Sequence, residues 1–169
     1  MWPEVGSFLS TVVAAGIGSW LTVRFFPLQA KKDEWEWQRR TEAQEFVFDS
    51  LSQIVFLSHN LVKSYLADDF SMSGKGLNES EKTIYDLLRG LHGRKAGLGL
   101  HLEPLQKEIL DEFAIDSQDV LDAANKTWGL WHHDDHESEV DHRTGTLSDL
   151  AKCASRYLER MEATLGANA

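Results

Sequence analysis

The feature that most constrains this chain is a long apolar run near its start. Residues 7–26 read SFLSTVVAAGIGSWLTVRFF, and no charged side chain appears in this run before Arg24. As an α-helix these twenty residues would extend about 30 Å, the thickness of the hydrocarbon layer of a membrane. We therefore predict that residues 1–27 form a transmembrane helix. The alternative is a core helix buried inside a globular domain.

The charges around the run distinguish a membrane anchor from a cleaved secretion signal. A signal peptide carries basic residues ahead of its apolar segment, whereas Glu4 is the only charge before Arg24 here. The basic residues follow the run, at Arg24, Lys31, Lys32, Arg39 and Arg40. By the positive-inside rule we predict a single-pass protein of the bacterial inner membrane, with its N-terminus outside and residues 28–169 in the cytoplasm. Pro27 predicts a break or kink where the chain leaves the bilayer.

One side of the predicted span gathers small and hydroxyl-bearing side chains. Small residues let helix backbones approach closely in lipid, and hydroxyls can line a water-filled pore. Both roles are open, and a ring of copies would satisfy them together. Arg24 either extends to the lipid headgroups or forms a basic collar at the cytoplasmic mouth of such a ring. The residues predicted for helix packing or pore lining are Ser7, Ser10, Thr11, Ala14, Gly18, Thr22 and Arg24.

The rest of the chain predicts an all-α fold. Residues 29–66 contain neither Gly nor Pro, which favours one long juxtamembrane helix. Apolar residues at spacings of three and four then recur in four further segments, and no alternating strand pattern appears. The predicted starts are Asn78 or Ser80, Pro104, Asp116 or Ser117, and Thr146, with the last helix ending at Gly166. We expect a cytoplasmic helical bundle over residues 28–169.

Net charge, cysteine content and the absence of catalytic motifs argue against several classes of function. A formal charge of -10 argues against a sequence-independent nucleic-acid coat over the whole surface, because like charge repels phosphate. Cys153 is the only cysteine, so the chain forms no internal disulfide, and we interpret it as a buried inert thiol. The sequence carries no serine or cysteine triad, no paired-carboxylate spacing and no dinucleotide fingerprint. We therefore predict neither an enzyme nor a cofactor.

One stretch is basic and rich in glycine. Residues 89–101 read RGLHGRKAGLGLH in a chain that is otherwise acidic. Glycines let backbone N–H groups approach an anion, and guanidinium groups bind phosphate through two parallel hydrogen bonds. A nucleotide, an oligonucleotide strand or a lipid headgroup would suit such a site. The alternative is a solvated helix end followed by a flexible loop. The candidate ligand-binding residues are Arg89, His92, Arg94, Lys95 and His101.

Two of these residues have a spacing similar to that of helical HEPN ribonucleases. Arg94 and His101 are separated by six residues, as in the motif with which those enzymes cleave RNA by transesterification. Those enzymes commonly carry Asn, Asp or His directly after the arginine, whereas Lys95 follows here. The resemblance implies a membrane-anchored ribonuclease, which we keep as an alternative.

A second cluster, WHHDDHESEVDH over residues 131–142, contains metal-ligand side chains by type. Its four histidines, His132, His133, His136 and His142, lie among carboxylates. The regular pair spacing of helical metal sites is missing, so we interpret the cluster as a hydrated surface loop and predict no metal site. A divalent-metal site and a pH-responsive patch are the alternatives.

The order of parts resembles a known group of proteins. A single outward-facing span, a juxtamembrane helix carrying Trp35, Trp37 and Arg40, and a helical domain are similar to small single-span membrane proteins of bacterial anti-phage defence systems. The resemblance implies a homo-oligomeric ion channel or pore that disrupts the membrane potential, gated by the cytoplasmic domain with a nucleotide or guide RNA. Several copies must assemble, because one span cannot enclose a pore. A membrane-tethered interaction module without conduction is the alternative.

Overall fold

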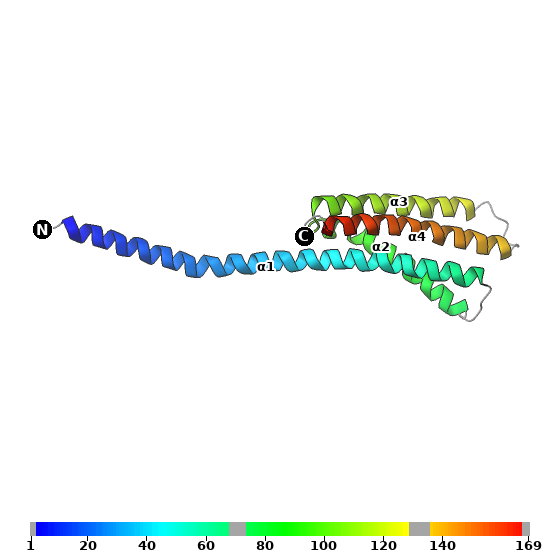
Figure 1. Cartoon of the computed structure of the whole chain (residues 1–169), viewed down its shortest axis with the longest axis horizontal. Helices are drawn as coiled ribbons and strands as arrows, with labels where there is room; N and C mark the ends of the chain where they lie inside the picture. Colours follow the sequence, from blue (N-terminus) through cyan, green and yellow to red (C-terminus); the bar gives the residue numbers. More distant parts are fainter. Residues whose placement is uncertain (1–2, 68–73, 129–135, 167–169) are drawn as a thin grey trace. The chain divides into compact units, whose positions relative to one another are not determined.

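The computed structural model describes the backbone of residues 3–67, 74–128 and 136–166, and the side chains of residues 29–67, 79–126 and 139–165. The described backbone forms four helices, and no strand occurs in these ranges. They are α1 (Pro3–Leu66), α2 (Gly74–Leu98), α3 (Pro104–Trp128) and α4 (His136–Gly166) (Figure 1). The predicted all-α fold is confirmed.

The chain divides into two compact units inside α1. The first is Met1–Thr41, and the second, Glu42–Ala169, holds the rest of α1 and the other three helices. In the second unit α3 and α4 lie antiparallel along their lengths, as part of a helical bundle (Figure 1). Its core is built from residues spaced three or four apart on each helix, among them Val47, Leu51, Ile54, Leu61, Ile84, Leu88, Leu91, Ile109, Leu110, Phe113, Leu147, Leu150, Ala154 and Met161.

A fully buried glutamine joins three helices of this bundle. Gln106 of α3 is 0% exposed. Its Oε1 accepts hydrogen bonds from Gln44 Nε2 of α1 at 2.9 Å and from the backbone N–H of Glu103 at 3.3 Å. Its Nε2 donates to Thr164 Oγ1 of α4 at 3.0 Å. Because a buried amide must be hydrogen-bonded, these contacts fix how α1, α3 and α4 meet.

α1 ends at Leu66, where the sequence predicts the end of the long helix. Of the break or kink predicted at Pro27, the break is wrong, because α1 continues through this residue. A proline inside a helix removes one backbone hydrogen bond and can kink the helix without ending it.

The predicted membrane span is not supported by these observations. In the part of the chain whose side chains are described, no helix is long and apolar enough to cross a bilayer. Residues 7–26 belong to the helical backbone of α1, but their side chains lie outside the described residues. The same holds for the predicted packing or pore-lining residues, Ser7, Ser10, Thr11, Ala14, Gly18, Thr22 and Arg24.

Two predicted helix starts lie inside helices that begin earlier in the chain. α2 begins at Gly74 rather than at Asn78 or Ser80, and α4 begins at His136 rather than at Thr146. The Thr146 hydroxyl donates to the carbonyl of His142 at 2.9 Å, so it bonds back within a helix instead of capping one. The predicted ends at Leu66 and Gly166 and the start at Pro104 are confirmed.

The predicted fifth helix does not exist as a separate element, because α3 runs without interruption from Pro104 to Trp128. Ser117 donates its hydroxyl to the carbonyl of Phe113 at 2.7 Å, one turn back. Asp116 accepts a hydrogen bond from Tyr157 of α4. Both residues are typical caps by type, yet here each uses its polar atoms inside a continuous helix.

Candidate functional site

The predicted anion-binding residues lie on α2 and in the turn after it. α2 continues through Gly90, Gly93 and Gly97 to Leu98, so this stretch is helical over residues 89–98. His101 follows in the turn, where its backbone N–H donates to the carbonyl of Leu98 at 2.9 Å. Successive helical residues point about 100° apart, so the basic side chains leave α2 in different directions.

Each arginine or lysine of the predicted site has a partner nearby. Arg89 Nη1 lies 3.1 Å from Asp86 Oδ1 on the same helix, and Lys95 Nζ lies 3.1 Å from Asp111 Oδ1 of α3. The guanidinium carbon of Arg94 lies 5.0 Å from the ring centre of Phe46 on α1, a cation–π contact. Within the described chain the five predicted residues make no polar contact with one another.

His92 turns toward α3 instead of toward an exposed site. Its Nε2 lies 2.9 Å from the hydroxyl of Ser117, which is fully buried. Because that hydroxyl donates to Phe113, we assign the proton to His92 Nε2, which donates to Ser117. Burial, and then the charge of Lys95, lower the pKa of His92, so the neutral ring is favoured. His92 thus joins α2 to α3.

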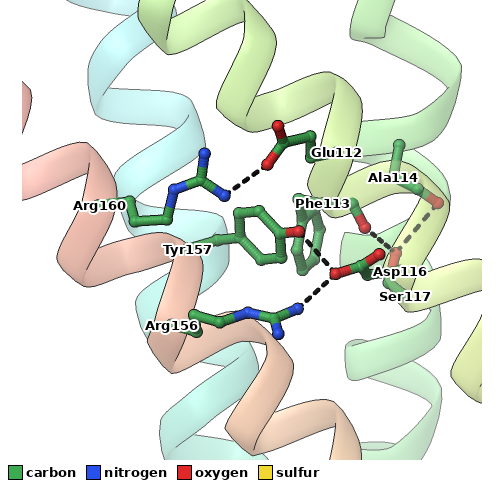
Figure 2. A network of polar contacts seen from close by, with 8 residues as sticks. All are labelled: Glu112, Phe113, Ala114, Asp116, Ser117, Arg156, Tyr157 and Arg160. Carbon is green, nitrogen blue, oxygen red and sulfur yellow. Dashed lines mark hydrogen bonds and ion pairs between the residues drawn. The ribbon is translucent and has the colours of Figure 1, made fainter.

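The largest described charge network was not predicted from the sequence; it joins α3 and α4 (Figure 2). Asp116 Oδ2 accepts a hydrogen bond from the Tyr157 hydroxyl at 2.6 Å and is also paired with Arg156. One turn along, Arg160 pairs with Glu112. Two carboxylates four residues apart on α3 therefore face two guanidinium groups four residues apart on α4. That spacing is visible in the sequence, but the pairing of the two helices is not.

Tyr157 lies at the centre of this network. The guanidinium carbons of Arg156 and Arg160 lie 4.9 and 5.1 Å from its ring centre, and Phe113 meets the ring edge to face at 5.7 Å. Burial, and then its hydrogen bond to Asp116, raise the pKa of Tyr157 to about 12. Both arginines are committed to carboxylates, so this network clamps α3 to α4.

Cys153 is buried beside this network, as predicted. Burial raises the pKa of its thiol, which keeps it protonated and unreactive.

A third polar cluster joins α1, α2 and α4. Glu81 accepts hydrogen bonds from the Tyr65 hydroxyl at 3.2 Å and from Arg143 at 3.0 Å. Arg143 also donates to Glu139 at 2.7 Å. A cavity of about 450 Å³ opens beside it between α2, α3 and α4, lined by Tyr85, Gln118, Asn125, His142 and Arg143 among others. Its size suits a small molecule, but Arg143 is already engaged by two carboxylates.

The histidine-rich cluster does not form a metal site in the described part of the chain. No group of three or more His, Cys, Asp or Glu side chains there lies close enough to hold an ion. The segment is also helical from His136 onward rather than a loop. The side chains of His132, His133 and His136 lie outside the described residues.

Comparisons with protein families, with curated proteins and with solved structures find no significant match to this chain. The resemblance to single-span defence proteins therefore stays a prediction from the order of parts.

Proposed function

We propose that this chain is a membrane-anchored protein of bacteria whose copies assemble into an ion-conducting pore, with the helical bundle of the second unit as its gate. The observation that carries the proposal is the uncharged run before Arg24, followed by clustered basic residues. A role in anti-phage defence, by loss of the membrane potential, is part of the same proposal and derives from the resemblance alone.

Assembly is needed because one helix cannot enclose a water-filled path. Small residues such as Ser10, Ala14 and Gly18 would let neighbouring spans pack closely, and hydroxyls such as that of Thr11 would face the path. The same helix, α1, also supplies Val47, Leu51 and Ile54 to the core of the bundle. A change in the bundle would therefore act on the helix that carries the proposed span.

An anionic signal such as a nucleotide or oligonucleotide would act on the bundle through α2. It would have to replace Asp86 at Arg89 or Asp111 at Lys95. Ion pairs with this much exposure contribute at most about 1 kcal/mol each, so a phosphate can displace them at small cost. This step would release contacts between α2 and α3 because Asp111 belongs to α3.

Ion flux from vesicles containing the purified protein tests the pore. Gly18→Leu should abolish flux, because the larger side chain separates the packed helices, while the protein still sediments with membranes. Val13→Leu, a substitution away from the small-residue side, is the matched control and should conduct. A detergent-solubilised particle with the mass of one chain, or unchanged flux in Gly18→Leu, would refute the pore.

Two exposed tryptophans favour a second candidate, a tethered interaction module without conduction. Trp35 and Trp37 are 61% and 66% exposed, and such side chains are typical of protein interfaces. This candidate predicts that a foreign membrane span replaces residues 1–27 without loss of function. We do not propose the ribonuclease, because Arg94 packs over Phe46 while His101 lies in the turn beyond α2.

A further inference from the structure

The part of α1 over residues 29–40 is exposed on all sides. Every side chain in it is exposed, including Trp35 at 61% and Trp37 at 66%. Burying an indole removes about 150–250 Å² of surface from water, so two largely exposed indoles on one short segment leave a large stabilisation unused. A partner that buried them would gain this stabilisation.

The charges of this segment are sorted onto two opposite faces of the helix. At about 100° per residue, Lys31, Lys32, Trp35 and Arg39 share one face, which we call the basic face. Asp33, Glu34, Trp37 and Arg40 share the opposite side, which we call the acidic face. Each face therefore has one tryptophan at its middle and an excess of one sign of charge.

Contacts within the segment arrange the basic face. The guanidinium carbon of Arg39 lies 4.2 Å from the ring centre of Trp35, so a cation covers that indole. Lys32 Nζ lies 3.7 Å from Glu36 on the edge of the face, with both side chains largely exposed. An ion pair this exposed is weak and can exchange partners at little cost.

We propose that the partner is a second copy of this chain, and that the basic face of one α1 packs against the acidic face of the next. The inference rests on the proposed function, because a shared membrane orientation makes the copies parallel. Lys32 and Asp33 are then level to within about 1.5 Å along the axis, and Trp35 and Trp37 to within about 3 Å. Each copy thus meets its neighbours' opposite charges and aromatic rings at the same height.

The same geometry argues against a two-fold parallel dimer through the basic face. Such a dimer would place Lys31, Lys32 and Arg39 against their own copies, which is repulsive. Because the two faces are opposite and complementary, each chain has two neighbours, and the contact repeats head to tail from copy to copy. A lipid surface fits less well, since Asp33 and Glu34 would be repelled by anionic headgroups.

Charge reversal with rescue tests this interface in the full-length protein in detergent, with particle mass as the readout. Lys32→Glu with Arg39→Glu should weaken association about tenfold or more, and so should Asp33→Lys with Glu34→Lys. All four substitutions in one chain exchange the excess charge of the two faces, so the faces are again opposite in sign and the mass should return to that of the natural protein.

Lys63→Glu with Lys126→Glu is the matched control. Both lysines are exposed on helices of the second unit, and the pair changes the net charge as much as Lys32→Glu with Arg39→Glu does. Unchanged mass in the two reversed variants, or no recovery in the four-fold variant, would overturn the interface. Reduced binding to anionic vesicles at unchanged mass would also overturn it and assign the segment to lipid.

The outcome is separable from that of the pore. Sedimentation with membranes and ion flux test the anchor and conduction, and neither measurement depends on the mass of the reversed variants. Retained oligomers in the reversed variants together with flux in the natural protein would leave the pore intact with a different subunit contact.

Discussion

At the scale of single residues, buried polar atoms determine how the helices of the second unit meet. His92 donates to Ser117 across α2 and α3, and Tyr157 donates to Asp116 across α3 and α4. Burial penalises the charged form of each side chain, so protonation of His92 and deprotonation of Tyr157 both destabilise the folded protein. The stability of the bundle should therefore respond to pH at these two residues, in opposite directions.

His92 should make the bundle less stable in acid. The pKa of His92 is lowered in the folded protein, so the unfolded chain takes up a proton first as the pH falls through about 6.5. The stabilisation from the neutral ring is complete above that pH and is lost as pH falls through the folded-state pKa. Urea unfolding should show that the free energy of unfolding falls more, from neutral to mildly acidic pH, in the natural protein than in His92→Gln. Equal losses would contradict this role.

Tyr157 should limit stability in alkali. Its pKa is raised to about 12, whereas a phenol in the unfolded chain ionises near pH 10. The unfolded state therefore loses its proton first, and the free energy of unfolding should fall as pH rises from about 10 to about 12. The Tyr157→Phe variant should lose less stability over this pH range, as measured by thermal unfolding followed by circular dichroism. Burial raises the pKa of Tyr65 and Tyr85 as well, so these two tyrosines still cause some loss of stability in alkali in the variant.

Residue identity predicts burial better than it predicts partners. The apolar periodicity indicates that Leu88, Phe113 and Leu150 are inside, and they are. The pairing of Asp116 with Tyr157 and Arg156 joins residues about 40 positions apart, and no local pattern encodes which helix faces which. Among the predicted ligand residues, the sequence shows that bases are clustered but not that they point apart around one helix.

At the scale of elements, two glycines near the end of α2 should respond oppositely to the same substitution. Gly93 lies in the exposed helix interior, and an added Cβ would meet nothing within 4 Å. Gly93→Ala should raise the free energy of unfolding by about 0.5–1 kcal/mol, because alanine loses less backbone entropy on folding.

Gly99, just after α2, is the matched comparison. A Cβ there would lie 3.2 Å from the carbonyl oxygen of Lys95 and 3.3 Å from the side chain of Lys107. Backbone at that distance cannot move aside easily, so Gly99→Ala should lower the midpoint of thermal unfolding. A stabilised Gly99→Ala, or a destabilised Gly93→Ala, would show that the turn and the helix end are arranged otherwise.

Helix ends were predictable where the backbone itself decides them. Pro104 starts α3, since a proline at the first helical position loses no hydrogen bond, and Gly166 ends α4. The wrong starts all rest on side chains that can cap a helix but can equally bond within one, as Thr146 and Ser117 do. Tertiary contacts decide between these uses, and they are absent from local sequence.

At the scale of the whole molecule, the proposed assembly should depend on salt. The basic and acidic faces of residues 29–40 are exposed, and interactions between exposed charges are screened within about 10 Å at 0.1 M salt. Raising the salt about tenfold should shift the detergent-solubilised protein toward smaller particles in mass photometry. The four-fold charge-swapped chain should show the same shift, whereas no response in either protein would indicate an interface held by apolar contact alone.

The buried amide of Gln106 has a consequence for how α1 can move. A rotation of α1 about its own axis by even a fraction of a turn would carry Gln44 away and leave an enclosed oxygen with one partner fewer. The oxygen keeps the N–H of Glu103, so the loss is about 0.5–1.5 kcal/mol, and this favours one rotation angle of α1 in the bundle. A signal that turns α1 within the bundle must therefore break this hydrogen bond first.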